Sequence, residues 1–269
     1  MKFVIAGATG TVGRHVVNAA VSRGHMVTAL SRSSGHDILT GVGLTHALSD
    51  ADAVIDVTSL MTTNARKASR FFTAITQNLH TAELEAGVGH HIGLSIVGIQ
   101  TIDAGYYAGK LAQERAISSG PVPWSLLRAT QFHEFAEQAV QRGSIGPLVA
   151  VPKILMRPIA ASEVGQRLVD VAEGHPGGRL KDLAGPADER LVDLVRRMFN
   201  FDRVKRPTLE VALPGKYWRR AASGVLRGAD DTARGSITFD EWLRGPDHAP
   251  VEIPPAARYL GMSLPRTAS

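Results

Sequence analysis

The chain has 269 residues, of which 44% are hydrophobic, and this is enough for one large domain or for one domain with a smaller appendage. The absence of cysteine excludes disulfides, thiolate metal sites and a cysteine nucleophile. The formal net charge of +5 comes with acidic residues interleaved among the basic ones, which indicates a solvated face more than a nucleic-acid-binding stripe.

In the first half of the chain, apolar β-type runs alternate with helical patterns. Expected strands are 2–6, 25–31, 53–58, 91–97 and 123–129, and expected helices are 12–22, 43–48, 64–86 and 106–118. This alternation predicts a doubly wound parallel α/β sheet of the Rossmann type, with helices on both faces. In such sheets ligands bind beyond the carboxyl ends of the strands.

The expected helix over 64–86 carries an apolar stripe at helical spacing. The stripe consists of Phe71, Ile75, Leu79 and Ala82, and we expect it to be buried.

After about residue 135 the pattern loosens into short strands and two helices. One helix is expected over 162–173 with Ser162 as its N-cap, and a small amphipathic helix is expected within 235–245. We expect a Rossmann core over 1–150 and a smaller substrate-covering part over 151–245 that is interleaved with it. Residues 246–269 are expected to form a surface or flexible tail.

The stretch KFVIAGATGTVGRHVV predicts a dinucleotide-binding turn between a strand and a helix. Gly7 permits the tight turn, Gly10 lets the backbone approach a diphosphate, and Gly13 lets the helix lie close to the strand. The helix N-terminus then offers unpaired amides to the phosphates, although a plain strand–helix turn is the alternative. The residues expected to contact the cofactor here are Gly7, Thr9, Gly10, Thr11, Val12, Gly13 and Arg14.

The next expected strand ends at Ser31, Arg32 and Ser33, without the Asp or Glu that an NAD site usually has there. Arg32 can form a bidentate pair with a 2′-phosphate, and the two serines can donate to it. Arg14 can approach the same phosphate from the first turn of the helix. The pattern therefore favours NADP(H) over NAD(H), with a solvated loop arginine as the alternative.

These features, with later motifs, resemble the short-chain dehydrogenase/reductase superfamily, specifically its atypical NmrA-like branch. The matching motifs occur in the family's order over roughly residues 1–175, namely GATGTVG, DIL, VIDVTS, LSIVG, YYAGK, LLRATQF and RPIAASEVG. The resemblance implies an NAD(P)-binding Rossmann protein and leaves the substrate open.

The resemblance also implies roles for individual residues. Asp37 matches a position that contacts the adenine amine, and Thr58 and Ser59 match cofactor contacts after their strand. Ser95 matches a serine that helps hold a substrate oxygen. The loop after the strand at 123–129 matches the surroundings of nicotinamide and substrate, and the expected pocket residues are Tyr107, Gln131, Phe132 and His133. A partly exposed structural histidine is the alternative for His133.

Tyr106 and Lys110 match the catalytic pair of the family, and Lys110 is expected to contact the cofactor as well. The two residues are four apart and therefore share one helix face. A nearby ammonium would lower the pKa of the tyrosine and favour proton transfer, and the same lysine could bind the nicotinamide ribose. Tyr107 also lies within reach of Lys110, so either tyrosine could be the donor, and an ordinary amphipathic turn is the alternative.

No metal site is expected. His90 and His91 begin a strand, so their side chains point to opposite faces and cannot chelate one ion. His133 and Glu134 are neighbours with no third ligand at metal spacing.

The leading hypothesis is an NADPH-dependent oxidoreductase that reduces a small carbonyl, enone or quinone-type substrate. The first alternative is an NADP(H)-binding redox-sensing regulator of the NmrA type without turnover. The second is an NAD-dependent sugar-nucleotide epimerase or dehydratase, which would normally need a larger C-terminal region. We expect a cytoplasmic protein with a small-molecule substrate, no membrane span and no direct nucleic-acid partner, and we leave open a homodimer or a partner protein.

Overall fold

The computed structural model describes residues 1–30, 36–102 and 104–250. Its central sheet contains the five predicted strands, β1 (Lys2–Ala6), β2 (Met26–Leu30), β3 (Ala53–Asp56), β4 (His90–Ile96) and β5 (Trp124–Ala129). They pair in parallel in the order β5-β4-β3-β1-β2. Three short parallel strands extend the sheet beyond β5, namely β9 (Gly178–Arg179), β10 (Leu183–Ala184) and β13 (Ala233–Arg234). The predicted doubly wound parallel sheet is confirmed.

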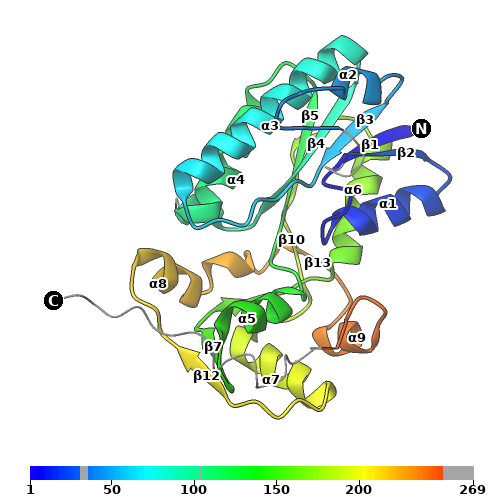
Figure 1. The fold of residues 1–269 in the computed structure, drawn as a ribbon. Helices are drawn as coiled ribbons and strands as arrows, with labels where there is room; N and C mark the ends of the chain where they lie inside the picture. Colours follow the sequence, from blue (N-terminus) through cyan, green and yellow to red (C-terminus); the bar gives the residue numbers. More distant parts are fainter. Residues whose placement is uncertain (31–35, 103, 251–269) are drawn as a thin grey trace.

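Helices cover both faces of this sheet, and they end within one or two residues of the predicted limits. Figure 1 shows α3 and α4 on one face, with α1 and α6 on the other. The helices of this lobe are α1 (Gly13–Ser22), α2 (Leu44–Ala47), α3 (Ala65–Ala86), α4 (Gly105–Ser118) and α6 (Ala161–Glu173). None of the helices in the described ranges is both long enough and apolar enough to cross a membrane.

The buried stripe of α3 runs through Phe72 instead of the predicted Phe71. Phe72, Ile75 and Leu79 are fully buried, whereas Phe71 is only half-buried and meets Phe72 edge-on at 5.2 Å between ring centroids. The steps of three and four residues from Phe72 follow the helical repeat, while repeated steps of four from Phe71 drift off the buried face.

The N-cap predicted for α6 is wrong. The cap position is Ala160, which makes no side-chain capping bond, and Ser162 lies inside the first turn. The neighbouring Glu163 links this helix start to the segment before α9, because its Oε1 accepts hydrogen bonds from the backbone N–H of Ser236 at 2.6 Å and from its hydroxyl at 3.0 Å. A carboxylate in the first turn also complements the helix dipole.

A second lobe lies below the sheet in Figure 1. Its short strands form one sheet in the order β12-β7-β6 and a separate antiparallel pair, β11-β8. Its elements are η2 (Ile99–Thr101), α5 (Phe135–Gly143), β6 (Ser144–Ile145), β7 (Leu148–Pro152), β8 (Leu155–Met156), β11 (Glu189–Arg190), α7 (Leu191–Phe201), β12 (Thr208–Val211), α8 (Lys216–Ala222), η3 (Val225–Arg227) and α9 (Phe239–Arg244). The small helix expected within 235–245 is present as α9, and Thr238 and Glu241 form its capping box.

The lobes do not divide at residue 150. The chain enters the second lobe with α5 and β7, and it returns to the Rossmann core with α6 and β10. Val164 and Leu168 of α6 are buried in one cluster with Val16 of α1. A Cβ at Gly165 would lie 2.8 Å from Cβ of His15, so the two helices approach one another closely at that glycine.

Residues 246–250 do not form a free tail. His248 is buried, and its imidazole lies between the carboxylates of Glu137 and Asp202, at 3.0 and 2.8 Å. These contacts join the segment after α9 to α5 and to the end of α7. The rest of the predicted tail, 251–269, lies outside the described residues.

Candidate functional site

The turn after β1 has the geometry of a phosphate cradle. Gly7 has a φ of +86°, and its N–H donates to the carbonyl of Leu30 at 3.2 Å. A Cβ at Gly13 would lie 2.1 Å from the Gly7 carbonyl oxygen, so only glycine lets α1 begin against this turn. Thr9 and Gly10 are exposed at its tip.

The start of α1 leaves donors for an anion. The N–H groups of Thr11 and Val12 make no hydrogen bond to any described residue, and Val12 is the N-cap of α1 without a side-chain cap. Unpaired amides and the positive end of the helix dipole together favour a bound phosphate. The residues present therefore fit the diphosphate of a dinucleotide, with Gly10 offering the open side of the turn.

Arg14 does not turn toward this cradle. Its guanidinium lies 3.6 Å from Glu134 and 3.9 Å from Asp247, both in or near the second lobe. Glu134 is buried, and burial raises the pKa of its carboxyl to about 7. Arg14 thus connects the glycine turn to the second lobe.

Two further cofactor predictions are not tested by the structure. Ser31, Arg32 and Ser33 lie outside the described residues. Asp37 is exposed, and its Oδ1 accepts a hydrogen bond from the N–H of Leu39 at 2.9 Å, which fixes a local turn. The contact of Asp37 with adenine stays a prediction.

Tyr106 meets Ser59 at the carboxyl edge of the sheet. The Tyr106 hydroxyl lies 3.1 Å from Oγ of Ser59, which follows β3 and is exposed. Burial raises the pKa of Tyr106 above its ordinary value, against a smaller lowering by Ser59. Burial thus outweighs the lowering predicted from Lys110, and Tyr106 is protonated at neutral pH.

Lys110 is buried, and its ammonium bonds inside the protein. Its Nζ donates to Oε1 of Gln113, and Nε2 of Gln113 donates to Oδ2 of Asp56 at 2.7 Å. Asp56 in turn accepts from the N–H and hydroxyl of Thr58, at 2.9 and 2.6 Å. Burial lowers the pKa of Lys110 to about 8. Lys110 therefore supports the segment that carries Thr58 and Ser59.

Ser95 is not brought together with Tyr106. It is buried on β4, paired in register with Arg128, and Arg128 donates to the Glu114 carboxylate of α4 at 2.6 Å. Within the described part of the chain, Ser59 is the serine hydrogen-bonded to Tyr106.

The predicted pocket residues separate into different environments. Tyr107 is buried and stacks on Tyr217 of α8 at 5.6 Å, which takes it into the core of the second lobe. Gln131 is buried with neither polar atom of its amide bonded to a described residue. Phe132 is half-buried and pairs with Ile159 in a parallel bridge.

His133 does not line an open pocket. Its imidazole is only 1% exposed and lies against Phe239 and Trp242, at 5.6 and 5.8 Å between ring centroids. Its Nε2 lies 3.0 Å from the carbonyl oxygen of Ile237. The histidine is structural, and it is fully enclosed because α9 folds over it.

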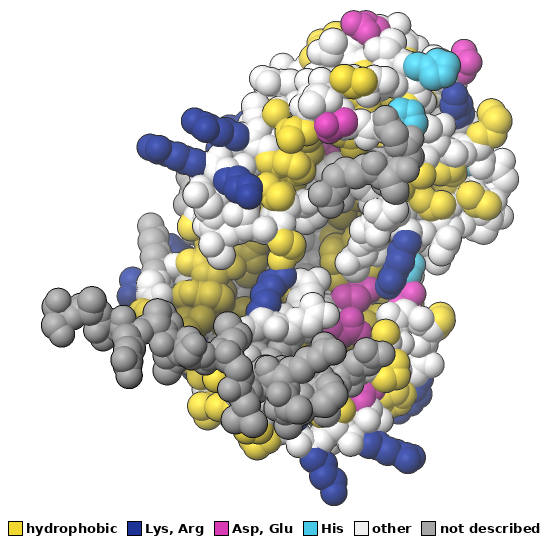
Figure 2. Space-filling model, in the orientation of Figure 1, with side chains coloured by type: hydrophobic (Ala, Val, Ile, Leu, Met, Phe, Trp, Pro, Cys, Tyr) yellow, Lys and Arg dark blue, Asp and Glu magenta, His cyan; other side chains and the backbone are white. Residues whose placement is uncertain are grey.

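The surface is hollowed between the two lobes, with basic and acidic side chains facing one another at one side of the hollow (Figure 2). A cavity of about 360 Å³ lies between the start of α6 and α9. It is lined by Ala160, Ser162, Ser236, Ile237, Glu241, Trp242, Gly245, Pro246 and Asp247. Neither Tyr106 nor Ser59 lines this cavity, so it is separate from the tyrosine site.

Comparison with known proteins agrees with this geometry. A sequence model described as NAD(P)H-binding matches residues 7–173, from the glycine turn to the end of α6. The chain belongs to this NAD(P)H-binding family. The match begins at the glycine turn between β1 and α1.

One curated relative of this NAD(P)H-binding protein is the photosystem II assembly factor Ycf39 of Synechocystis sp. (strain ATCC 27184 / PCC 6803 / Kazusa). The two chains are 30% identical over 111 residues, which are 36% of this chain and 34% of the relative. The match thus spans about a third of the relative's length.

Solved structures match nearly the whole chain at low identity. The UDP-glucose 4-epimerase of Thermotoga maritima, solved with UDP-glucose, has a TM-score of 0.70 and 13% identity, over 91% of this chain and 96% of the epimerase chain. The NADPH-dependent quinone oxidoreductase of Escherichia coli, complexed with NADPH, has a TM-score of 0.68 and 16% identity, over 90% of this chain and 98% of that one. At these identities the likeness shows the Rossmann fold alone.

Four residues of the site were not among the predicted ones, namely Asp56, Gln113, Glu134 and Tyr217. Asp56 had a visible signal, since it is the one acid in the apolar run AVIDV. Gln113 lies three residues after Lys110 and so on the same helix face. The partners of Glu134 and Tyr217 come from the other lobe, and no local pattern indicates them.

Proposed function

We propose that this chain is an NADPH-dependent oxidoreductase that reduces a small carbonyl, enone or quinone-type substrate. The observation that carries the proposal is the Tyr106 hydroxyl, held 3.1 Å from Ser59 at the carboxyl edge of the sheet, where a Rossmann protein binds its ligands. Membership of the NAD(P)H-binding family supports a dinucleotide beside this hydroxyl.

In this proposal some residues bind the cofactor and the substrate, and others supply the proton. The amides of Thr11 and Val12 would hold the diphosphate, and Gln131 offers buried amide atoms to the polar part of a ligand. A bound reduced nicotinamide supplies the hydride. Tyr106 is protonated at neutral pH, as tyrosines ordinarily are, and would donate its proton to a substrate oxygen, with Ser59 orienting its hydroxyl.

The preference for NADPH rests on Arg32 and on the missing acid after β2. An NAD-dependent sugar-nucleotide epimerase would normally have that acid. The preference is measured by comparing NADPH with NADH in binding and in turnover. Tighter binding of NADH would move the proposal toward the epimerase.

A redox-sensing regulator is the second candidate, and one observation favours it. Lys110 is turned to Gln113 and Asp56, so the ammonium expected beside the nicotinamide ribose supports the fold instead. A sensor needs the phosphate cradle but no proton donor. Its partner protein, or a second copy of the chain, would respond to the oxidation state of the bound cofactor.

The test is steady-state oxidation of NADPH with a panel of quinones, enones and small aldehydes, using wild type, Tyr106→Phe and Tyr107→Phe. We expect Tyr106→Phe to lower kcat by about 10²-fold or more with an unchanged Kd for NADPH, because one proton donor is removed. Tyr107→Phe is the matched comparison, since that hydroxyl is buried beside Tyr217, and most of the activity should remain.

Tight NADPH binding without turnover of any panel member would contradict the oxidoreductase and favour the sensor. Loss of turnover in Tyr107→Phe alone would move the donor to Tyr107.

A further inference from the structure

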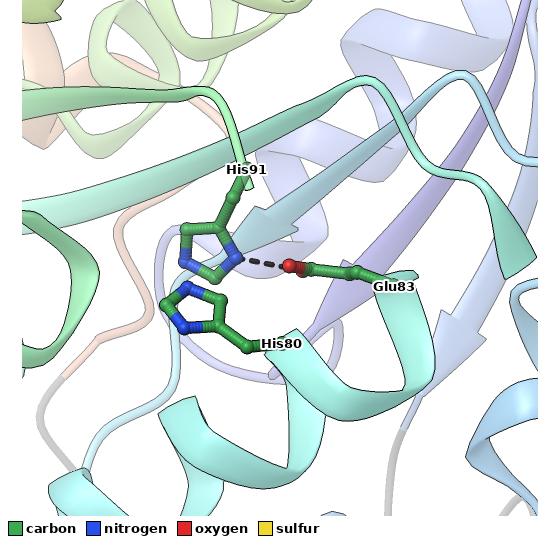
Figure 3. A group of neighbouring side chains, drawn as sticks. All are labelled: His80, Glu83 and His91. Carbon is green, nitrogen blue, oxygen red and sulfur yellow. Dashed lines mark hydrogen bonds and ion pairs between the residues drawn. The ribbon is translucent and has the colours of Figure 1, made fainter. Parts of the chain in front are cut away.

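Three buried side chains with metal-binding groups meet between α3 and β4, away from the cofactor turn (Figure 3). His80 and Glu83 are three residues apart on α3, and His91 is the second residue of β4. Their exposed fractions are 6%, 0% and 0%. One ligand atom from each residue lies within 4.8 Å of the others. Within the described residues, His80, Glu83 and His91 form the group of His, Asp and Glu side chains whose ligand atoms lie this close together.

The contacts inside this group leave three polar atoms unsatisfied. Nδ1 of His91 lies 2.7 Å from Oε1 of Glu83, and the rings of His80 and His91 meet edge-on at 4.9 Å between centroids. Nε2 of His80, Oε2 of Glu83 and Nε2 of His91 are buried with no hydrogen-bond partner among the described residues. A buried polar atom without a partner costs about 1–3 kcal/mol, so three in one place indicate a missing ligand.

We propose that His80, Glu83 and His91 bind a divalent transition-metal ion of the Zn²⁺ class. Two imidazole nitrogens and one carboxylate oxygen are a donor set that suits Zn²⁺, with bonds of about 2.0–2.2 Å. Neither Ca²⁺ nor Mg²⁺ fits this set, because both prefer oxygen ligands only.

The place of the group in the fold makes this ion structural. His91 stands near the amino end of β4, whereas Ser59 and Tyr106 lie at the carboxyl edge of the sheet. A Cβ at Gly120 would come within 2.2 Å of Cε1 of His80, so the loop after α4 closes the group from that side. An ion here joins α3 to β4 and has no room for a substrate. Since the site is enclosed, the ion enters as the chain folds.

The experiment refolds the full chain from denaturant with Zn²⁺, with Co²⁺, or with a chelator. Metal retained after gel filtration is measured by mass spectrometry, and thermal unfolding is measured on each sample. We expect stoichiometric Zn²⁺, a Tm raised by about 5 °C or more over the chelated sample, and a visible Co²⁺ spectrum of a low-coordinate nitrogen and oxygen site. The Kd for NADPH should be the same in both samples, which keeps this test independent of the proposed function.

Variants decide which residues hold the ion. His80→Gln and His91→Gln should each retain less than a tenth of the Zn²⁺. The matched control is His90→Gln, because His90 is also buried, lies beside His91, and uses its Nε2 on Ser125 at 2.8 Å. The control should retain the full amount.

Several outcomes would overturn the metal site. They are a wild-type chain refolded with Zn²⁺ that retains none, equal retention by His80→Gln and wild type, and a Co²⁺ spectrum of an exposed octahedral ion. In each case the three residues form a Glu–His pair with an adjacent imidazole, and water molecules satisfy the remaining polar atoms. If the histidine variants fail to fold, Glu83→Gln and the wild-type Co²⁺ spectrum still give the answer.

Discussion

Gly10 and Gly13 share one turn but lack a side chain for different reasons. A Cβ at Gly13 would lie 2.1 Å from the Gly7 carbonyl oxygen, which is a collision inside the protein. A Cβ at Gly10 would have Gly7 O as its nearest neighbour at 3.2 Å and would otherwise face solvent. Packing therefore excludes a side chain at Gly13, whereas at Gly10 the proposed diphosphate would exclude one.

The two substitutions should separate stability from cofactor binding. We expect Gly13→Ala to lower the free energy of unfolding by about 1–3 kcal/mol, because the turn has to move. Gly10→Ala should change it by less than about 1 kcal/mol and still weaken NADPH binding by about tenfold, because its methyl group takes the space of the diphosphate. Urea unfolding and calorimetry measure the two effects. Unchanged NADPH affinity in Gly10→Ala would contradict the placement of the diphosphate.

The negative charge of Glu134 lowers the stability of the folded chain at neutral pH. Burial raises the pKa of its carboxyl to about 7, and Arg14 at 3.6 Å only partly opposes this. Between pH 4.5 and 7 the folded chain then binds more protons than the unfolded chain, so stability falls as the pH rises through that range.

Glu134→Gln should remove this pH dependence. We expect a variant of nearly wild-type stability at pH 5 that is more stable than wild type at pH 8, by about 1–3 kcal/mol. Urea unfolding at the two pH values measures the difference, with Glu85→Gln at an exposed position of α3 as the control. A constant difference between variant and wild type at both values would contradict the raised pKa.

At the scale of elements, α4 joins the tyrosine site to the sheet. Its residue Gln113 is 1% exposed and connects Lys110 with Asp56 at the end of β3. Asp56 holds Thr58, and the next residue, Ser59, meets Tyr106. The Tyr-x-x-x-Lys spacing thus has a structural use in this chain, since the lysine fixes the segment that orients the tyrosine.

Breaking this connection should destabilise the fold strongly. Gln113→Leu leaves a buried ammonium and a buried carboxylate without their shared partner, so we expect a loss of about 2–4 kcal/mol in the free energy of unfolding. The same substitution at Gln77, which is exposed on α3, is the control in urea unfolding. Equal losses in the two variants would show that the network carries no stability.

At the scale of the whole molecule, the two lobes depend on one another because the chain passes between them repeatedly. The α6 helix covers α1, and β10 pairs beside β5, although both come after the first segment of the second lobe. One cluster of buried residues also joins Ile99 and Tyr107 to Phe199 and Trp242. The Rossmann core is therefore incomplete without the residues after 150.

A fragment of residues 1–150 should not fold by itself. Without α6 the apolar face of α1, including Val16, is left exposed to water, so the fragment should show no cooperative thermal transition and no NADPH binding. Circular dichroism and calorimetry on the fragment and the full chain measure this. A cooperative transition with NADPH affinity in the fragment would contradict the interdependence of the lobes.

Local physical rules were enough for the elements of the first half of the chain. Period-two and helical patterns and the glycines of the first turn depend on neighbours within a few residues, so the sheet, its helices and the glycine turn were predicted closely. Phe72 and Ser162 show the limit of this approach, because a shift of one or two residues is decided by what the helix packs against.

The sequence by itself therefore determined the fold class, the family and the glycine turn after β1. Only the tertiary structure decided the direction of Lys110, the pairing of Tyr106 with Ser59, the enclosure of His133 and the meeting of His91 with His80 and Glu83. In each of these cases the partner comes from another element. A side chain between two possible partners turns to the one that satisfies its charge and hydrogen bonds away from water, and that choice exists only after the elements have packed.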